Sequence, residues 1–241
     1  MEQDETIKSF PEAIEDLYKL HYITKKYEHY IRINPETLKL FEATKFVYAY
    51  FAFNSFYNYD WETSLKENKL VDYEGKTTFI NGEERSFRDT DKFKRMSDFI
   101  ISQMDEPDKN EFFKILTISQ NKSNNFDQKT QGIISRMNEI TEDNRITESM
   151  INKFKSAFTT LLETKTLEKG AYKNDILYFV YMVRNNIFHG TKNTIQMSQQ
   201  GQRKRLEIYA NILIATNELL FRKLIRNGIF HPHNSYSINI K

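Results

Sequence analysis

The hydrophobic and polar positions of this chain follow a helical period over most of its length. The clearest example is residues 172–190, where apolar side chains recur three or four positions apart: Ile176, Phe179, Val180, Val183 and Ile187. This spacing predicts a helix with one apolar stripe, which we expect to be buried along that side. Asn174 or Asp175 is suited to cap its start, and Gly190 is suited to the left-handed conformation that ends many helices.

Start and stop signals predict helices on both sides of this stretch. Ser9 followed by Pro11 indicates a helix that runs towards Tyr30, and the start signal at 34–36 indicates a longer, central helix ending near Tyr57. The same reasoning predicts further helices at residues 90–104, 108–119, 131–140, 147–163 and 202–226.

The last predicted helix, 202–226, carries a wide apolar belt and is followed by Gly228, which is suited to end it. A short connection joins it to the helix at 172–190, so we expect the two helices to pack antiparallel. That connection, 191–201, is polar and is predicted to be flexible, as is the turn-rich stretch 121–130.

Residues 70–88 depart from the helical period. Two short stretches, 77–80 and 83–87, flank Asn81-Gly82, a pair that favours a two-residue hairpin turn. A lone hairpin is only marginally stable, so we expect it to rest on the helices as an insertion. The predicted fold class is therefore all-α, an antiparallel helical bundle forming a single domain over residues 1–241 with a small β-hairpin insertion.

Composition narrows the class of protein. The chain has 241 residues, of which 39% are hydrophobic and 28% charged, as is typical of a globular domain with a sizeable core. The absence of cysteine excludes disulfides and thiolate chemistry. The first ten residues do not resemble a secretion signal, and the longest uncharged apolar run, 46–53, is too short to cross a bilayer. We therefore expect a cytoplasmic protein with no membrane partner.

Basic residues are concentrated towards the C-terminal end. The formal net charge is only +2, but residues 184–226 contain eight lysines and arginines against two glutamates. An excess of positive charge near a cleft attracts a polyanion. For the run at 203–205 taken by itself, the favoured alternative is a solvated helix face.

A polar cluster closes the helix predicted at 172–190: Arg184, Asn185, Asn186 and His189. Asparagine is an indifferent helix former, so two asparagines beside an arginine suggest a role beyond ending the helix. On an ideal helix Arg184 and His189 point about 140° apart. They converge if the helix loosens before Gly190, or if a second copy crosses the first in an isologous dimer. The alternative is that Arg184 binds a carboxylate and His189 caps the last carbonyl groups.

Segment 184–190, RNNIFHG, resembles the R-polar-x-x-x-H signature of the HEPN superfamily. Arg184 matches the arginine of that motif, Asn185 the polar residue and His189 the histidine. A second stretch, FAFNSFY at 51–57, resembles the aromatic FNxxY helix found upstream in many HEPN-like proteins. The two stretches occur in the order that the family shows.

The resemblance implies a HEPN-like helical bundle and a metal-independent endoribonuclease that needs no cofactor and leaves a 2′,3′-cyclic phosphate on its RNA product. It also implies an active cleft at the interface of a homodimer. Roles in toxin–antitoxin modules or anti-phage defence, with a cognate antitoxin or regulatory protein as partner, are expected on the same basis.

The residue types suit this chemistry. A histidine such as His189 titrates at about pH 6.5 and can take a proton from a ribose 2′-OH or give one to the leaving 5′-oxygen. Arg184 can bind two phosphate oxygens and stabilise their growing charge, while Asn185 orients the phosphate or the imidazole. We expect further substrate contacts from Asn186, Lys192, Arg203, Lys204 and Arg205.

Asn54 and Tyr57 are expected to support the site from the aromatic helix. An unpaired buried amide is costly, so Asn54 needs a partner. Either it bonds a neighbouring helix and locks the core, which we favour, or it reaches the cleft and helps to hold Arg184 or His189.

Two other functions stay open. A catalytically silent HEPN-like domain would bind RNA, a nucleotide or a protein partner through the same residues, and a helical interaction protein would use the motif only structurally. The tail contains His231 and His233, but no acidic or histidine cluster accompanies them. We therefore interpret the tail as a surface segment and predict no metal site.

Overall fold

The computed structural model describes residues 9–26, 40–102, 104–117, 126–140, 146–188 and 194–231. Within these ranges helices form most of the structure, and one two-stranded antiparallel sheet accompanies them. This confirms the prediction of a largely helical chain with a small β-hairpin. None of the helices in these ranges is long and apolar enough to cross a bilayer.

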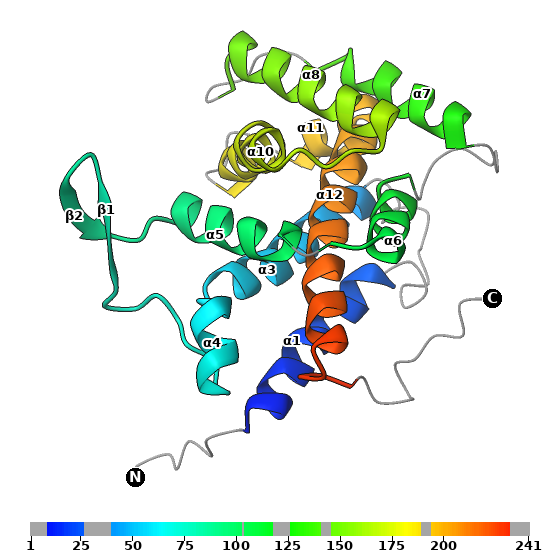
Figure 1. Ribbon diagram of the computed structural model, residues 1–241. Helices are drawn as coiled ribbons and strands as arrows, with labels where there is room; N and C mark the ends of the chain where they lie inside the picture. Colours follow the sequence, from blue (N-terminus) through cyan, green and yellow to red (C-terminus); the bar gives the residue numbers. More distant parts are fainter. Residues whose placement is uncertain are drawn as a thin grey trace.

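The helices carry the labels of Figure 1. In chain order they are α1 (Phe10–Lys25), α3 (Phe41–Tyr57), α4 (Trp61–Glu67), α5 (Asp89–Ile101), α6 (Glu106–Leu116), α7 (Phe126–Met137), α8 (Glu148–Thr164), α9 (Lys169–Ala171), the π-helical segment η2 (Tyr172–Leu177), α10 (Tyr178–Phe188), α11 (Thr194–Ser198) and α12 (Gln200–Arg226).

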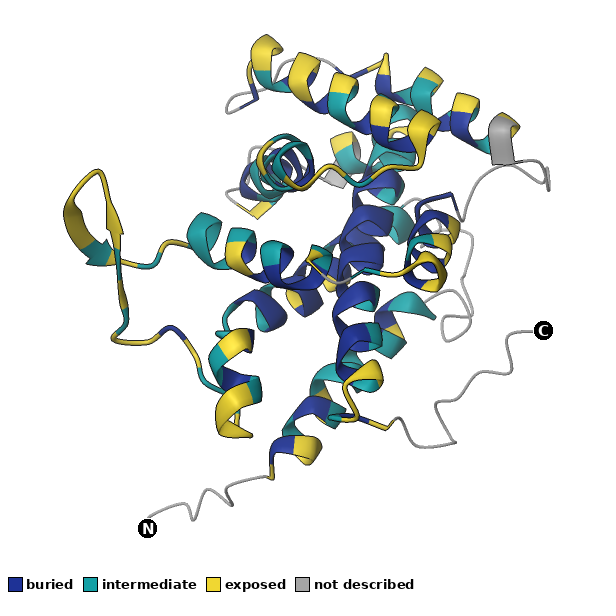
Figure 2. Cartoon of the chain, viewed as in Figure 1, coloured by how far each residue is buried: buried dark blue, intermediate teal, exposed yellow. Residues whose placement is uncertain are grey.

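The longest of these helices, α12, forms the centre of the core. It packs most extensively on α3 and next on α6, and buried residues cover most of its surface (Figure 2). A second layer, formed by α8 against η2 and α10, closes the top of the molecule in the view of Figure 1. There Phe179 stacks on Phe154 with ring centroids 4.2 Å apart and meets Tyr209 of α12 at 5.8 Å.

Several helix ends follow the predicted signals. Ser9 precedes α1, and its backbone N–H donates to Glu12 Oε2 at 2.8 Å, so the predicted start is confirmed, whereas the helix ends at Lys25 rather than near Tyr30. The start signal at 34–36 lies outside the described residues, but α3 ends at Tyr57 as predicted.

The C-terminal end of α12 is the one predicted from Gly228. This glycine has φ +70°, its N–H donates to Ile225 O at 3.0 Å, and the N–H of Ile229 donates to Leu224 O at 3.0 Å. The two bonds form a Schellman motif, which satisfies carbonyls that the helix end leaves free.

The predicted β-hairpin is present. Strands β1 (Thr77–Ile80) and β2 (Glu83–Ser86) pair antiparallel, and Asn81 and Gly82 have the positive φ values, 54° and 82°, of a type I′ turn. Figure 1 shows that the hairpin projects away from the helices. Most of its residues are exposed, so the expectation that the hairpin rests on the helices is wrong. An ion pair at 2.8 Å between Arg85 Nη1 and Asp91 Oδ2 links its base to α5.

Three helical segments were not predicted where they occur. Helix α4 begins at the cap residue Asp60, which accepts from the hydroxyl of Thr63 at 2.9 Å, and Trp61 anchors the helix with only 2% of its surface exposed. Helix α7 starts at Phe126, inside the stretch predicted as a loop, because polar residues such as Gln and Lys continue a helix well. Helix α11 lies inside the connection predicted to be flexible, where Met197 packs on the core.

The predicted antiparallel packing of the last helix on the helix at 172–190 is wrong in its main feature. Figure 1 shows α12 running from top to bottom while α10 is seen along its axis, so the two cross steeply. The apolar belt of α12 is covered chiefly by α3 and α6. Its contact with the other helix includes the bond from Tyr172 to Thr216 and the packing of Phe179 on Tyr209.

Candidate functional site

The helix that carries Arg184 begins earlier than the sequence suggested. Glu168, rather than Asn174 or Asp175, caps its start by accepting from the N–H groups of Gly170, at 2.9 Å, and Ala171. These two backbone hydrogen bonds hold the pKa of Glu168 below its usual range. A π-helical turn, η2, then leads into α10, so the helix is wider in its first part than a regular α-helix.

The predicted apolar stripe fixes this helix in the core. Ile176, Phe179 and Val180 are fully buried, Val183 is 5% exposed, and Ile187 is partly buried at the end. On η2, the hydroxyl of Tyr172 hydrogen-bonds the hydroxyl of Thr216 at 2.6 Å, and burial raises the pKa of Tyr172 above its usual range. The direction of α10 is therefore set by its buried side, and its last turn is brought to the surface beside α3.

Arg184 lies between two aromatic rings at that last turn. Its guanidinium carbon is 4.8 Å from the ring centroid of Tyr50 on α3 and 5.0 Å from that of Phe188 on its own helix. One terminal nitrogen donates to Asn185 Oδ1 at 2.8 Å. The two rings and the amide hold the planar cation in place, since each ring face attracts a cation.

The charge of Arg184 has no counter-ion among the described residues. None of their carboxylates forms an ion pair with it, and its buried Nε has no hydrogen-bond acceptor among them. The alternative that Arg184 binds a carboxylate is therefore wrong for the part of the chain that is described. Because Nε is buried, an external anion would meet the terminal nitrogens of this partly buried guanidinium, a planar group suited to phosphate oxygens.

A chain of hydrogen bonds supports the ring beneath Arg184. The hydroxyl of Tyr50 bonds that of Tyr57 at 3.1 Å, and the hydroxyl of Tyr57 donates to Asn54 Oδ1 at 2.5 Å. Burial raises the pKa of Tyr50 to about 12 and that of Tyr57 still further, so both phenols are neutral. Among the described residues, Asn54 thus bonds within its own helix rather than to a neighbouring one, and it reaches Arg184 only through the two tyrosines.

The two asparagines of the motif are directed inward. Asn185 is 8% exposed, and besides accepting from Arg184 its Nδ2 lies 3.9 Å from Met182 Sδ. Asn186 is 1% exposed, so a substrate in solution does not reach its amide in this conformation. The structure places Asn185 as a support for the guanidinium and Asn186 in the interior.

Two of the three basic residues at 203–205 already bind protein acceptors. Arg203 forms a bidentate pair with Glu42 of α3, at 2.8 and 2.9 Å, and this hydrogen bonding raises its pKa further. Arg205 donates to Glu139 O at 2.9 Å and to Gln202 Oε1 at 3.0 Å. Lys204 is partly exposed. The first two side chains therefore hold α12 to neighbouring segments.

Other predicted site residues fall outside the described ranges. His189 and Lys192 are among them, as is His233 in the tail; α10 is described up to Phe188, the residue before His189. His231 is described and exposed. Within the described ranges, no group of three or more histidine or acidic side chains lies close enough to hold a metal ion.

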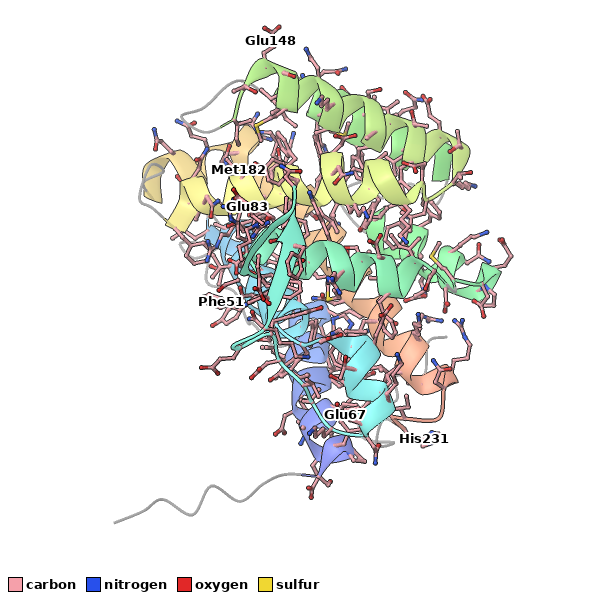
Figure 3. The ribbon with its side chains drawn as sticks, turned by 60° about the vertical axis from the view of Figure 1, so that its left-hand side comes forward. Phe51, Glu67, Glu83, Glu148, Met182 and His231 are labelled. Carbon is pink, nitrogen blue, oxygen red and sulfur yellow. The ribbon has the colours of Figure 1, made fainter. Side chains whose placement is uncertain are left out.

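The contacts of Arg184 with aromatic rings were not predicted from the sequence. Phe51 and Phe188 are 46% and 39% exposed, and their ring centroids are 5.7 Å apart. Figure 3 shows Phe51 at the edge of the molecule, below Met182 of α10. A signal was present in the chain, because Phe188 lies four residues after Arg184 and such pairs meet on a helix.

A separate cavity of about 480 Å³ lies at the other end of the same helix, between α8 and η2. Ser156, Glu168 and Asp175 are among its polar lining residues. Ile176, which also lines it, is two helical turns from Arg184, so a ligand held there would not contact the guanidinium.

Comparison with protein-family models, with curated proteins and with solved structures finds no match. The resemblance of segments 184–190 and 51–57 to the HEPN signatures therefore stays a prediction.

Proposed function

We propose that this chain is a metal-independent endoribonuclease of HEPN type that cleaves RNA with Arg184, Asn185 and His189. The observation that carries the proposal is the guanidinium of Arg184, fixed between Tyr50 and Phe188 with no carboxylate partner among the described residues. Such a group is ready to bind a phosphate, and His189 follows it in the chain at the spacing of the motif.

In the proposed reaction, the imidazole of His189 takes the proton of a ribose 2′-OH. The 2′-oxygen then bonds to phosphorus, the bond from phosphorus to the 5′-oxygen breaks, and that oxygen takes up a proton from an imidazolium. Arg184 binds the phosphate oxygens and stabilises the charge that develops on them, while Asn185 keeps the guanidinium in position. The products are a 2′,3′-cyclic phosphate and a 5′-hydroxyl.

The cleft is proposed to be shared by two copies of the chain. A homodimer brings a second Arg184 and a second His189 to the same phosphate, so that one imidazole can act as base and the other as acid. The biological role that fits is that of a toxin or anti-phage defence enzyme, restrained by an antitoxin or regulatory protein.

The test is cleavage of end-labelled RNA by the purified chain in EDTA. Arg184→Ala and His189→Ala are each expected to reduce the cleavage rate at least 100-fold, as is typical for loss of one acid–base or charge-stabilising group. Arg136→Ala and His231→Ala serve as matched controls, because Arg136 lies on α7 and His231 is exposed beyond the C-terminal end of α12. Circular dichroism must show the same helical content for all variants.

Two further readouts define the chemistry. The product should carry a cyclic phosphate, and RNA with a 2′-deoxy nucleotide at the cleavage site should resist the enzyme. RNA binding without cleavage would instead support the catalytically silent domain. If the chain neither binds nor cleaves RNA, the proposal is excluded. Light scattering tests the shared cleft, because a strictly monomeric active enzyme contradicts it.

A further inference from the structure

Exposed aromatic rings lie beside Arg184 where α3 and α10 meet. Phe51 and Phe188, which we call the aromatic platform, are 46% and 39% exposed and have ring centroids 5.7 Å apart, tilted by 41°. Tyr48, which is 43% exposed, precedes Phe51 by one turn on the same face of α3. Neighbouring exposed aromatic rings of this kind offer flat apolar faces to a ligand.

The Phe188 ring of the aromatic platform is supported from below. The ring of Phe188 is 6.0 Å from the ring of Tyr50, which is 1% exposed and hydrogen-bonded to Tyr57. Arg184 fills the space above Tyr50 and contacts Phe188 as well. A ligand that binds here therefore meets a Phe188 ring whose orientation is already set, which reduces the entropy lost on binding.

Charge indicates which occupant fits this surface. Arg184 borders the aromatic platform and has no carboxylate partner among the described residues. A second copy of the same surface would bring arginine against arginine unless an anion lay between them. A nucleotide supplies both complementary features, since its base is flat and apolar and its phosphate is anionic.

We propose that the aromatic platform stacks an unpaired base of single-stranded RNA while Arg184 binds the phosphate attached to that nucleotide. The inference rests on the proposed function and identifies how its substrate is held. Bases in a duplex are stacked on their neighbours and do not offer a free face, so the site selects single-stranded segments. Stacking of this kind accepts every base, so little sequence preference is expected from the aromatic platform.

Binding is measured with short 2′-O-methyl RNA, which cannot be cleaved through its 2′-oxygen. One strand carries the fluorescent base 2-aminopurine at a central position, and a matched strand has an abasic site there. We expect the full-length wild-type chain to quench 2-aminopurine and to bind the abasic strand about 10-fold more weakly, the loss expected for one stacked base. Annealing the complementary strand should weaken binding by at least as much.

Variants separate stacking from phosphate binding. Phe51→Ala combined with Phe188→Ala should bind intact and abasic strands equally and lose the quenching, whereas Phe188→Tyr should retain both. Arg184→Ala should instead reduce the salt dependence of binding by about one phosphate contact. Phe79→Ala is the matched control, because this phenylalanine is 70% exposed on the projecting hairpin beside Glu83 and Glu84 and should have no effect.

The outcomes distinguish this inference from the proposed function. Suppose that the wild type cleaves RNA and that the abasic site weakens binding by the same factor in the wild type and in the platform variant. Stacking on the aromatic platform is then excluded, and the proposed nuclease function is retained. If the wild type neither binds nor cleaves RNA, the proposed function is excluded, and the stacking proposal that rests on it is excluded as well. If the platform variant loses binding only because it becomes monomeric, as light scattering would show, the surface is a subunit interface and the stacking proposal is overturned.

Discussion

Asn217 is a buried side chain of α12 and is 0% exposed. Neither its Oδ1 nor its Nδ2 has a hydrogen-bond partner in the part of the chain that the structure describes. Removing an amide from water without replacing its hydrogen bonds costs about 1–3 kcal/mol. The fold therefore carries this cost inside its central helix.

Replacing this amide by an apolar group of similar size should stabilise the protein. We expect Asn217→Leu to raise the free energy of unfolding by about 1–2 kcal/mol, because the penalty for burying the amide disappears and leucine favours the helix. Urea unfolding followed by circular dichroism measures the change. Asn110→Leu on α6, where the asparagine is exposed, reports the gain from helix propensity alone. A loss of stability in Asn217→Leu would show that the amide is satisfied in solution, for example by buried water.

At the scale of elements, Arg203 joins the start of α12 to the start of α3. Its bidentate bonds to Glu42 are 2.8 and 2.9 Å long, and the two side chains are 26% and 16% exposed. Charge-assisted bonds in a partly buried setting contribute more than a pair on the open surface. This position gives Arg203 a structural role, although the charge pattern of the sequence had suggested contact with substrate.

The two roles make different predictions for Arg203→Ala. If the role is structural, the free energy of unfolding falls by about 1 kcal/mol, as in Glu42→Ala, and the double variant loses no more than either single variant. The rate of RNA cleavage per folded molecule is then unchanged. Lys204→Ala is the neighbouring control and should alter neither property. Loss of cleavage without loss of stability in Arg203→Ala would restore the role in substrate binding.

Local signals explain which elements could be predicted from the sequence. Ser9, Asn81-Gly82 and Gly228 each impose a conformation through their own backbone or side-chain chemistry, and all three act as expected. The start of the helix at 172–190 and its packing could not be predicted from such local signals. Its cap, Glu168, is a residue type not preferred at that position, and the crossing with α12 depends on how α3 and α6 cover the remaining apolar belt.

In the candidate site, too, some features follow from local signals in the sequence and others only from tertiary packing. The motif lies at the end of α10 and the aromatic stretch at 51–57 lies on α3, and the structure brings these two segments together. The sequence could not show that Tyr50 lies beneath Arg184, or that Asn186 is buried, because both follow from tertiary packing. Periodicity identifies a buried stripe, but it does not identify which helix covers it.

At the scale of the whole molecule, an ionic network joins α1, α6 and α12 in a partly buried position. Glu218 of α12 binds His21 Nε2 and Lys25 Nζ, each at 2.9 Å, and Lys25 also reaches Glu111 of α6 at 3.2 Å. Arg222 completes the network at 3.3 Å from Glu218. Three helices distant in sequence are therefore connected through one carboxylate.

The pKa values within this network have opposite physical causes. His21 is 1% exposed, and burial lowers its pKa below 6.5, although the bond to Glu218 acts in the other direction. For Glu218, burial opposes ionisation, but the bonds from His21 and Lys25 outweigh it and hold its pKa well below its usual range. Both groups thus bind protons more weakly in the folded state than in the unfolded state.

The sign of the resulting pH dependence follows from linkage. A histidine whose pKa is lowered on folding leaves the protein fully stable above the unfolded pKa, about 6.5, and destabilises it as pH falls below that value. Glu218 adds to the loss only as pH approaches its unfolded pKa, about 4.5. Between pH 7 and pH 5, the part of the change in the free energy of unfolding that comes from these two groups is therefore due mainly to His21. This part cannot exceed about 1.4 kcal/mol for each pH unit.

We expect thermal unfolding to show this loss directly. The melting temperature of the wild type should fall from pH 7 to pH 5, whereas His21→Gln, which cannot take up a proton there, should be less stable at pH 7 but change less between the two pH values. His231→Gln is the matched control, since that histidine is exposed beyond the C-terminal end of α12, and it should keep the pH dependence of the wild type. An equal fall in wild type and His21→Gln would show that other groups set the acid sensitivity. Because Tyr18 and Phe221 enclose the imidazole ring, protonation has to occur within the packed core and is expected to loosen the contact of α1 with α12.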